Sequence, residues 1–398
     1  MTSDDGWRTT GASQPVDVAP EQRIIGDGVA GGWSPLIDGD VHITWRAADE
    51  LLAYLPRVWH ARLRSGRGAP RIRPAFYLPH RGYHKEAAAP EGGPPGSDPA
   101  TLARDWLDRH GIAYAVLNHF DLPVISTWGD IDYPNDLARA YNDWLIERWL
   151  VHDRRFLGSM VVATQDAVAA AAEIDRVGQH PQLVQVLLAS GTRLPYGVRA
   201  FQPIYAAAAR HGLHVAIHTG TEGLGTSNPP TSAGWPSYAM EWRACQPQNL
   251  AAHVVSLVTE GVFVRFPDLK LVLLEGGAAW LPQLLWRLDK NYKAMRSECP
   301  WLRELPSAYL LRHVRFGTQG LERPDDPDHL WTMLRMMEGE RVLLYASNYP
   351  RWDVEAPGEC VVLRSAEPEA RRRIAHENAR QLYGLPRVAR SSPARAVL

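Results

Sequence analysis

The sequence predicts a single (β/α)8 (TIM) barrel that carries loop insertions. The chain has 398 residues, of which 45% are hydrophobic, and one large core suits this length because α/β barrels often exceed about 200 residues as one domain. Short apolar runs alternate with helix-like stretches, which is typical of βα units around a parallel sheet. Polar residues follow several of these runs, where a barrel carries its active site.

Eight apolar runs are expected to form the strands. They occupy residues 35–43, 113–118, 156–164, 183–190, 214–220, 269–277, 313–319 and 341–350. Helix-like segments separate most of these runs, and the clearest are 140–151 and 279–295. The carboxyl ends of barrel strands converge on one face, so polar side chains at those ends are predicted to share one pocket.

Two long insertions interrupt the alternation of strands and helices. Residues 64–98 are rich in Pro, Gly and basic residues, and residues 220–240 are rich in Gly, Ser and Pro. Loops of this length are either functional lids or disordered. The second insertion follows the fifth strand directly and is predicted to be a lid, whereas both alternatives stay open for the first.

The two ends of the chain are predicted to lie outside the barrel. Residues 1–34 are rich in Gly, Pro, Asp and Ser, and residues 387–398 have a similar composition. We therefore expect a flexible amino-terminal arm, a barrel over residues 35–386 and a flexible carboxyl-terminal tail.

The composition favours a small-molecule partner. The 43 basic and 44 acidic residues give a net charge of −1, so the chain shows no basic surface of the kind that binds nucleic acid or an anionic membrane. Three widely spaced cysteines, without CxxC spacing, indicate a reducing compartment. The first residues form no secretory signal and no long apolar run is present, so a cytoplasmic protein is expected.

Polar residues at the predicted strand ends form the candidate site. Two histidines at the ends of different barrel strands, one of them near an acidic residue, favour a site over isolated structural histidines. Both metal binding and metal-free acid–base chemistry by a His–carboxylate pair remain open at this point. The residues are Asp40, His42 and Thr44 from the first strand, His218 from the fifth, Glu275 from the sixth, Gln319 from the seventh and Asn348 from the eighth.

Several motifs resemble one known family, the amidohydrolase-related proteins, often called amidohydrolase family 2. The family includes aminocarboxymuconate-semialdehyde decarboxylases and resorcylate-type decarboxylases. The resemblance extends over roughly residues 35–386 in the right order. The motifs that carry it include "DGDVH" (38–42), "VAIHTG" (215–220), "PSYAMEW" (236–242), "HVRFGTQ" (313–319), "YASNYPRWD" (345–353) and "HENARQLYGL" (376–385).

The resemblance implies a mononuclear divalent metal held by a strand-one His-x-His, a strand-five His and a strand-eight Asp. His42 and His218 match this pattern, but Thr44 and Asn348 replace the other two ligands. An amide neither holds the negative charge nor accepts the proton that Asp would. We therefore predict a weakened site of His42, His218 and Asp40, with zinc favoured, manganese or iron as alternatives, and a metal-free site also open.

Further roles follow from residue chemistry. An Arg side chain can bind a substrate carboxylate through two hydrogen bonds, and an aromatic ring can line the binding site of an apolar substrate. The predicted catalytic residues are Glu275, Asn348, Asp40 and His218. The predicted substrate-binding residues are Trp235, Arg243, Gln319 and Arg351.

These features together predict a hydrolase or a decarboxylase-like C–C lyase that acts on a small carbonyl- or carboxylate-bearing molecule, cyclic or aromatic. One alternative is a metal-independent cyclase, dehydratase or isomerase of specialised metabolism. Another is a catalytically silent binding barrel. A homodimer is expected from the resemblance and from Trp- and Leu-rich helical surfaces such as 279–288.

Overall fold

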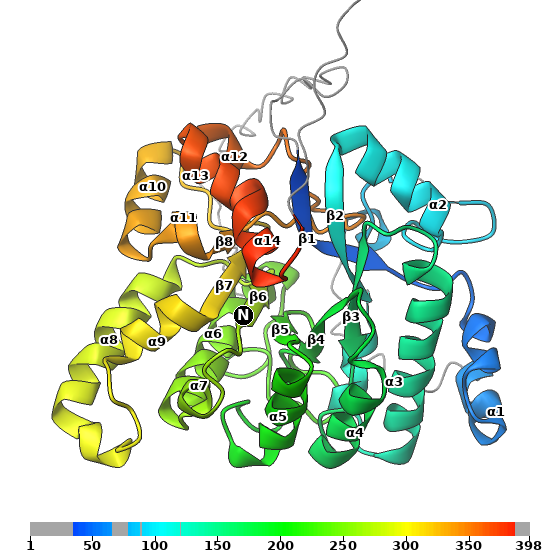
Figure 1. Ribbon diagram of the computed structural model, residues 1–398, viewed down its shortest axis with the longest axis horizontal. Helices are drawn as coiled ribbons and strands as arrows, with labels where there is room; N and C mark the ends of the chain where they lie inside the picture. The colour runs from blue at the N-terminus through cyan, green and yellow to red at the C-terminus, as the bar shows by residue number, and fades with distance from the viewer. Residues whose placement is uncertain (1–34, 66–78, 88–89, 120, 387–398) are drawn as a thin grey trace, which may run out of the picture.

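The computed structural model describes residues 35–65, 79–87, 90–119 and 121–386. Eight parallel strands follow one another in chain order around a barrel, so the predicted (β/α)8 fold is confirmed (Figure 1). Each strand lies where an apolar run predicted it. The strands are β1 (Leu36–Ile43), β2 (Ile112–His119), β3 (Phe156–Val161), β4 (Leu183–Ala189), β5 (His214–His218), β6 (Leu271–Leu274), β7 (Val314–Gly317) and β8 (Leu343–Leu344).

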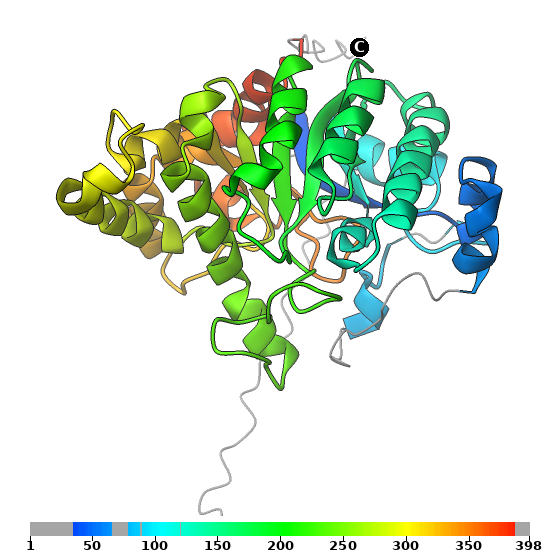
Figure 2. The same ribbon diagram turned by 90° about the horizontal axis from the view of Figure 1, so that it is seen from below.

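Helices surround the strands, as both ribbon views show (Figures 1 and 2). The two helical segments predicted most clearly from the sequence correspond to α3 with the turn after it and to α8. The helices are α1 (His60–Arg64), α2 (Pro99–Leu102), α3 (Asp132–Trp144), α4 (Ala167–Val177), α5 (Gln202–Arg210), α6 (Ala239–Thr259), α7 (Val262–Arg265), α8 (Trp280–Met295), α9 (Pro306–His313), α10 (Pro327–Met336), α11 (Gly339–Val342), α12 (Val361–Ser365), α13 (Pro368–Arg372) and α14 (Asn378–Leu382).

The strands form the centre of one large core because both of their faces are covered. Every residue of β1, β3, β4 and β6 is buried. Parallel strands that are covered on both faces read as continuous apolar runs rather than as alternating patterns. Burial on both faces therefore explains why the strands could be predicted from continuous apolar runs in the sequence.

The barrel closes where β1 meets the segment after β8. Gly39 N donates to Tyr345 O at 2.8 Å, and Asn348 N donates to Asp40 O at 2.9 Å. The predicted eighth strand (341–350) is longer than the observed one, because a side chain interrupts the regular ladder here. The Asp38 carboxylate accepts the Ser347 N–H at 2.9 Å, and the register of β1 shifts between Asp38 and Val41.

The second insertion forms an irregular loop between β5 and α6. In Figure 2 this loop and the first turns of α6 project from the end of the barrel at which the strands finish. Its base is held to the loop after β2, since Thr226 N donates to Thr127 O at 2.7 Å. The position fits a lid, and the lid role itself stays a prediction.

The first insertion is described in part. Residues 82–84 run beside the segment after β8, where His84 N donates to Pro350 O at 2.9 Å and Trp352 N donates to Gly82 O at 3.1 Å. This part of the insertion therefore packs next to the end of β8. The predictions for residues 1–34 and 387–398 lie outside the described residues.

None of the helices that the structure describes combines the length and the apolar character that a membrane span requires.

Buried histidines predict a loss of stability in acid. Burial lowers the pKa of His253 from 6.5 to about 4, although Ser190 O, 2.8 Å from Nε2, opposes the shift. The unfolded chain takes up this proton first as the pH falls, so stability is lost between pH 6.5 and 4. The contribution of His253 is about 3 kcal/mol over that range.

Chemical denaturation of the metal-free protein between pH 7 and 4.5 measures this effect. We expect the His253→Gln variant to be less stable at pH 7 but to lose less further stability on acidification. The exposed His329 provides the control, and His329→Gln should keep the wild-type pH slope. An unchanged slope in His253→Gln would contradict the assignment.

Candidate active site

A group of three buried side chains lies at the carboxyl ends of β1 and β5. Asp40, His42 and His218 each offer one ligand atom, and these atoms all lie within 4.8 Å of one another. Asp40 is 3.4 Å from Nε2 of each histidine, through Oδ1 to His42 and Oδ2 to His218. A carboxylate and two imidazoles form a donor set that suits a divalent cation.

The charges in this group are strongly coupled. Burial would raise the pKa of Asp40, but His42 and His218 hold it well below its ordinary value. Burial lowers the pKa of His42 to about 4. Burial acts in the same direction on His218, yet Asp40 and then Glu275 raise its pKa to about 9. At neutral pH these shifts favour an anionic Asp40, a neutral His42 and a protonated His218 in the metal-free group.

The tautomer of His218 is set by the backbone. Its Nδ1 lies 2.7 Å from Thr219 O, which only accepts hydrogen bonds, so Nδ1 carries a hydrogen. In the neutral ring Nε2 then carries the lone pair. Nε2 faces the Asp40 carboxylate, with Oδ2 at 3.4 Å. A cation would bind at this nitrogen after displacing its proton.

Asp40 is held by a chain of hydrogen bonds through the barrel interior. Asn118 Nδ2 donates to Asp40 Oδ1 at 2.8 Å, and Gln185 Nε2 lies 3.4 Å from Asn118 Oδ1. Tyr383, after α14, donates to Gln185 Oε1 at 2.8 Å. Since Asp40, Asn118 and Gln185 are fully buried, this chain fixes the orientation of the carboxylate.

A second polar group lies beside the first one. Asn348 Nδ2 donates to Glu275 Oε1 and also to Asp353 Oδ1, the latter at 3.0 Å. Two arginines compensate the carboxylates, since Arg243 pairs with Asp353 and Arg351 Nε lies 3.8 Å from Glu275 Oε1. Glu275 Oε2 is 3.8 Å from His218 Nδ1, which connects this group to the three candidate ligand residues.

The ionisation of the two carboxylates differs. Burial would raise the pKa of Glu275, but Arg351 and His218 lower it below its ordinary value. Burial raises the pKa of Asp353, and the neighbouring Glu275 raises it further, while Arg243 opposes both effects. Glu275 is thus the more acidic of the two.

Glu275 and Asn348 have an unusual backbone conformation. Their φ angles are 58° and 64°, in the left-handed region that residues other than glycine seldom adopt. Such conformations cost about 1–3 kcal/mol each and gather at functional sites. Both residues lie where the chain turns out of the barrel, and their side chains meet each other beside His218.

The other predicted residues lie in different surroundings. Gln319 is buried, and its Nε2 donates to Asp353 O at 3.3 Å. Trp235 is 60% exposed on the loop before α6, and the edge of its ring lies near Gly223. Asp40 and His42, both on β1, belong to the group of three candidate metal ligands.

Sequence reasoning missed Asp353 and Asn118. Asp353 is the last residue of the "YPRWD" segment. It lies beyond the predicted strand end, so the rule that selects polar residues at strand ends did not select it. Asn118 is at the end of an apolar run and could have been found by the same rule that identified Asn348.

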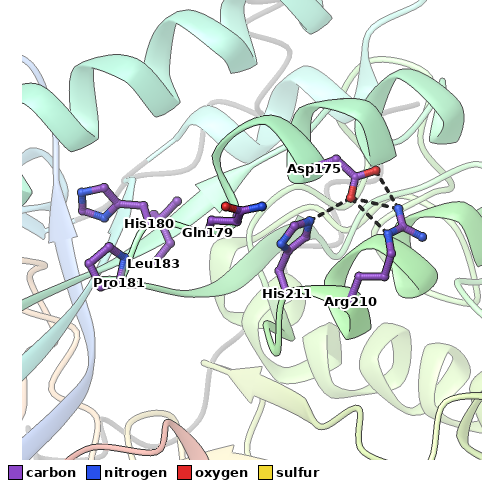
Figure 3. A pocket seen from close by; sticks show the side chains of 8 residues that line it. Asp175, Gln179, His180, Pro181, Leu183, Arg210 and His211 are labelled. Carbon is purple, nitrogen blue, oxygen red and sulfur yellow. Dashed lines mark hydrogen bonds and ion pairs between the residues drawn. The ribbon is translucent and has the colours of Figure 1, made fainter.

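The structure also has an open hollow of about 810 Å³ at the opposite end of the barrel (Figure 3). Its residues come from the ends of α4 and α5 and the start of β4. Asp175 binds Arg210 and His211 there, with the shortest contacts at 2.6 and 2.9 Å. These ion pairs lie in an open surface, far from the strand ends that carry the ligand residues.

Comparison with known proteins identifies the family. Residues 37–385 match the amidohydrolase family, so the chain belongs to it. This confirms the resemblance found from motifs and the prediction of an amidohydrolase-related enzyme. The gamma-resorcylate decarboxylase of Polaromonas sp. (strain JS666 / ATCC BAA-500) is 24% identical over 300 residues, which cover 71% of this chain and 86% of the relative.

Solved structures share the fold. The 5-carboxyvanillate decarboxylase from Sphingomonas paucimobilis has a TM-score of 0.63 and 23% identity, covering 88% of this chain and 99% of the other. The dihydroxybenzoic acid decarboxylase from Polaromonas sp. JS666, solved with bound manganese and the inhibitor 2-nitroresorcinol, has a TM-score of 0.60 and 19% identity, covering 89% and 98%.

The network predicts the effect of a carboxylate at position 348. The Asn348→Asp change removes the donor to Glu275 and Asp353 and places a third carboxylate against them. We expect the metal-free protein to lose about 3 kcal/mol of unfolding free energy at pH 8, the size seen when a buried charge is left uncompensated. The loss should shrink toward pH 5, because repulsion raises a carboxyl pKa and lets a proton bind.

Urea denaturation with a chelator present measures both values. Asn228→Asp in the exposed loop is the control for the same chemical change and should cost less than about 0.5 kcal/mol. Equal stability of Asn348→Asp and the wild type at pH 8 would show that the three side chains are not in contact.

Proposed function

We propose that this protein is a metal-dependent decarboxylase of a small aromatic or cyclic hydroxycarboxylate. The observation that carries the proposal is the buried group of Asp40, His42 and His218 at the strand ends, directly beside Glu275 and Arg351. The decarboxylases of aromatic carboxylates among the relatives support this reaction class. Hydrolysis assisted by a strand-eight carboxylate is disfavoured, since residue 348 is an amide.

We propose manganese as the resident metal. Asp40, His42 and His218 would hold it, with Asn348 Oδ1 as a fourth candidate donor, because this atom is fully buried and has no hydrogen-bond partner among the described residues. Carbonyl and carboxylate oxygens suit Mn²⁺, and manganese is bound in the dihydroxybenzoic acid decarboxylase of Polaromonas. When bound, the metal would offset negative charge on the substrate oxygens. Zinc, favoured by the sequence, has no comparable support.

Substrate binding is assigned to Arg351 and Gln319. Arg351 is 8% exposed and its Nε is 3.8 Å from Glu275, so its guanidinium lies beside the proposed proton-transfer group. A guanidinium binds carboxylates and phenolates through charged hydrogen bonds. Gln319 Oε1 is a buried acceptor without a partner in the described part of the chain and can receive a substrate hydroxyl.

Glu275 is assigned the proton transfer. Decarboxylation breaks the bond between the ring carbon and the carboxylate, CO₂ leaves, and the ring carbon takes up a proton. The pKa of Glu275 is lowered, so it starts as a carboxylate, can accept the substrate's hydroxyl proton and can return it to the ring carbon. Asn348 cannot exchange protons in this way, and it instead fixes the Glu275 carboxylate by donating to Oε1.

Removal of the ligand histidines tests the function. We expect His42→Ala and His218→Ala to lose bound Mn²⁺ and at least about 100-fold in CO₂ release from 2,6-dihydroxybenzoate or 5-carboxyvanillate, given that metal sites lose affinity steeply with each ligand. The exposed His329→Gln should retain both properties. Metal content by elemental analysis and CO₂ release are the measurements.

Two outcomes would overturn the proposal. CO₂ release that survives complete metal removal would favour a metal-independent reaction in the same pocket. Stoichiometric Mn²⁺ without CO₂ release from any aromatic hydroxycarboxylate, but with hydrolysis of a cyclic amide or ester, would assign hydrolase chemistry.

A further inference from the structure

The side-chain amide of Asn348 is held between two carboxylates. Its Nδ2 donates to Glu275 Oε1 and to Asp353 Oδ1, so both hydrogens of the nitrogen have anionic acceptors. The reversed amide would place its oxygen against both carboxylates and would lose both hydrogen bonds. The charges therefore select one orientation of the amide.

This orientation leaves Asn348 Oδ1 as an acceptor that nothing in the described chain satisfies. The residue is fully buried, and a buried polar atom without a partner costs about 1–3 kcal/mol. The observed orientation leaves Oδ1 without a hydrogen bond from the described residues but keeps the two hydrogen bonds from Nδ2 to carboxylates. The consequence is an oxygen that is available to a bound ligand.

Asp353 connects Asn348 to two other elements of the barrel. Arg243, in the first turns of α6, pairs with Asp353 Oδ2 and stacks on the Trp352 ring with its guanidinium carbon 5.1 Å from the centroid. Gln319, after β7, donates to the Asp353 carbonyl at 3.3 Å. The side chain of Asp353 is only 13% exposed, so these contacts hold it rigidly.

We propose that Asp353 is a positioning residue of the active site, which, with Arg243 behind it, fixes the amide of Asn348 so that Oδ1 serves as an acceptor for the bound metal. Glu275 supplies the second anchor for the same amide. The arrangement explains an amide at position 348, because a carboxylate there would face two others. The part of this proposal that concerns metal binding rests on the proposed function.

The test compares Mn²⁺ affinity, measured by calorimetry, in variants of the full chain. Asp353→Asn keeps the shape but removes one anion, so Glu275 alone offers an anionic acceptor to the Asn348 amide. Mn²⁺ should then bind about 10-fold more weakly, the size typical for partners of metal ligands.

Glu355→Gln is the matched control. Glu355 lies two residues along the same segment, is also a buried carboxylate, and pairs with Arg323 at 2.6 Å. Its carboxylate pairs with Arg323 and not with the Asn348 amide, so this variant should bind Mn²⁺ within twofold of the wild type. Wild-type affinity in Asp353→Asn, or an equal loss in Glu355→Gln, would overturn the positioning role.

Melting temperatures of the metal-free protein separate this proposal from the proposed function. If Asp353 positions Asn348, the melting temperature of the double variant Asn348→Ala/Asp353→Asn should fall little further than that of the less stable single variant. Additive losses would overturn the positioning role even if Mn²⁺ binds. A wild-type protein that binds no Mn²⁺ would sink the metal assignment, while the melting temperatures would still decide on Asp353.

Discussion

The main-chain hydrogen bonds that join the end of β1 to the segment after β8 close the barrel, and the candidate active site depends on them. Asn348 N donates to Asp40 O, so one bond places residues from the two ends of the chain side by side. The Asp38 carboxylate takes the Ser347 N–H and replaces a main-chain acceptor in this seam. Without the closure, Asp40 and His42 would lie at a sheet edge, and Glu275 would have no amide to hold it.

Charge compensation is the second constraint on the pocket. Asp40, Glu275 and Asp353 bring three carboxylates into a buried volume, and desolvated anions persist only with paired cations or strong donors. Arg351 and Arg243 provide the cations, and the amide of Asn348 bridges two of the anions. An amide at the end of β8 is therefore the electrostatically consistent residue once Asp353 is present.

The fold was largely readable from the sequence, because buried parallel strands leave continuous apolar runs at βα spacing. The lengths of β6 and β8 were overestimated. β8 is short because the Asp38 carboxylate takes the Ser347 N–H and interrupts the ladder. β6 ends directly before Glu275, whose positive φ angle turns the chain out of the sheet. A conformation of this kind leaves no periodic signal, so strand ends at a strained site are hard to place.

The sequence by itself determined the barrel and the polar residues at its strand ends, including the candidate ligands Asp40, His42 and His218, because these features depend on local pattern and residue type. Only the tertiary structure decided which partners these groups have. Asp353 reached the site through a turn after β8, and Trp235 stayed exposed on its loop. Hydrogen bonds and ion pairs between distant segments depend on side-chain direction after the chain turns, and no local pattern encodes that direction.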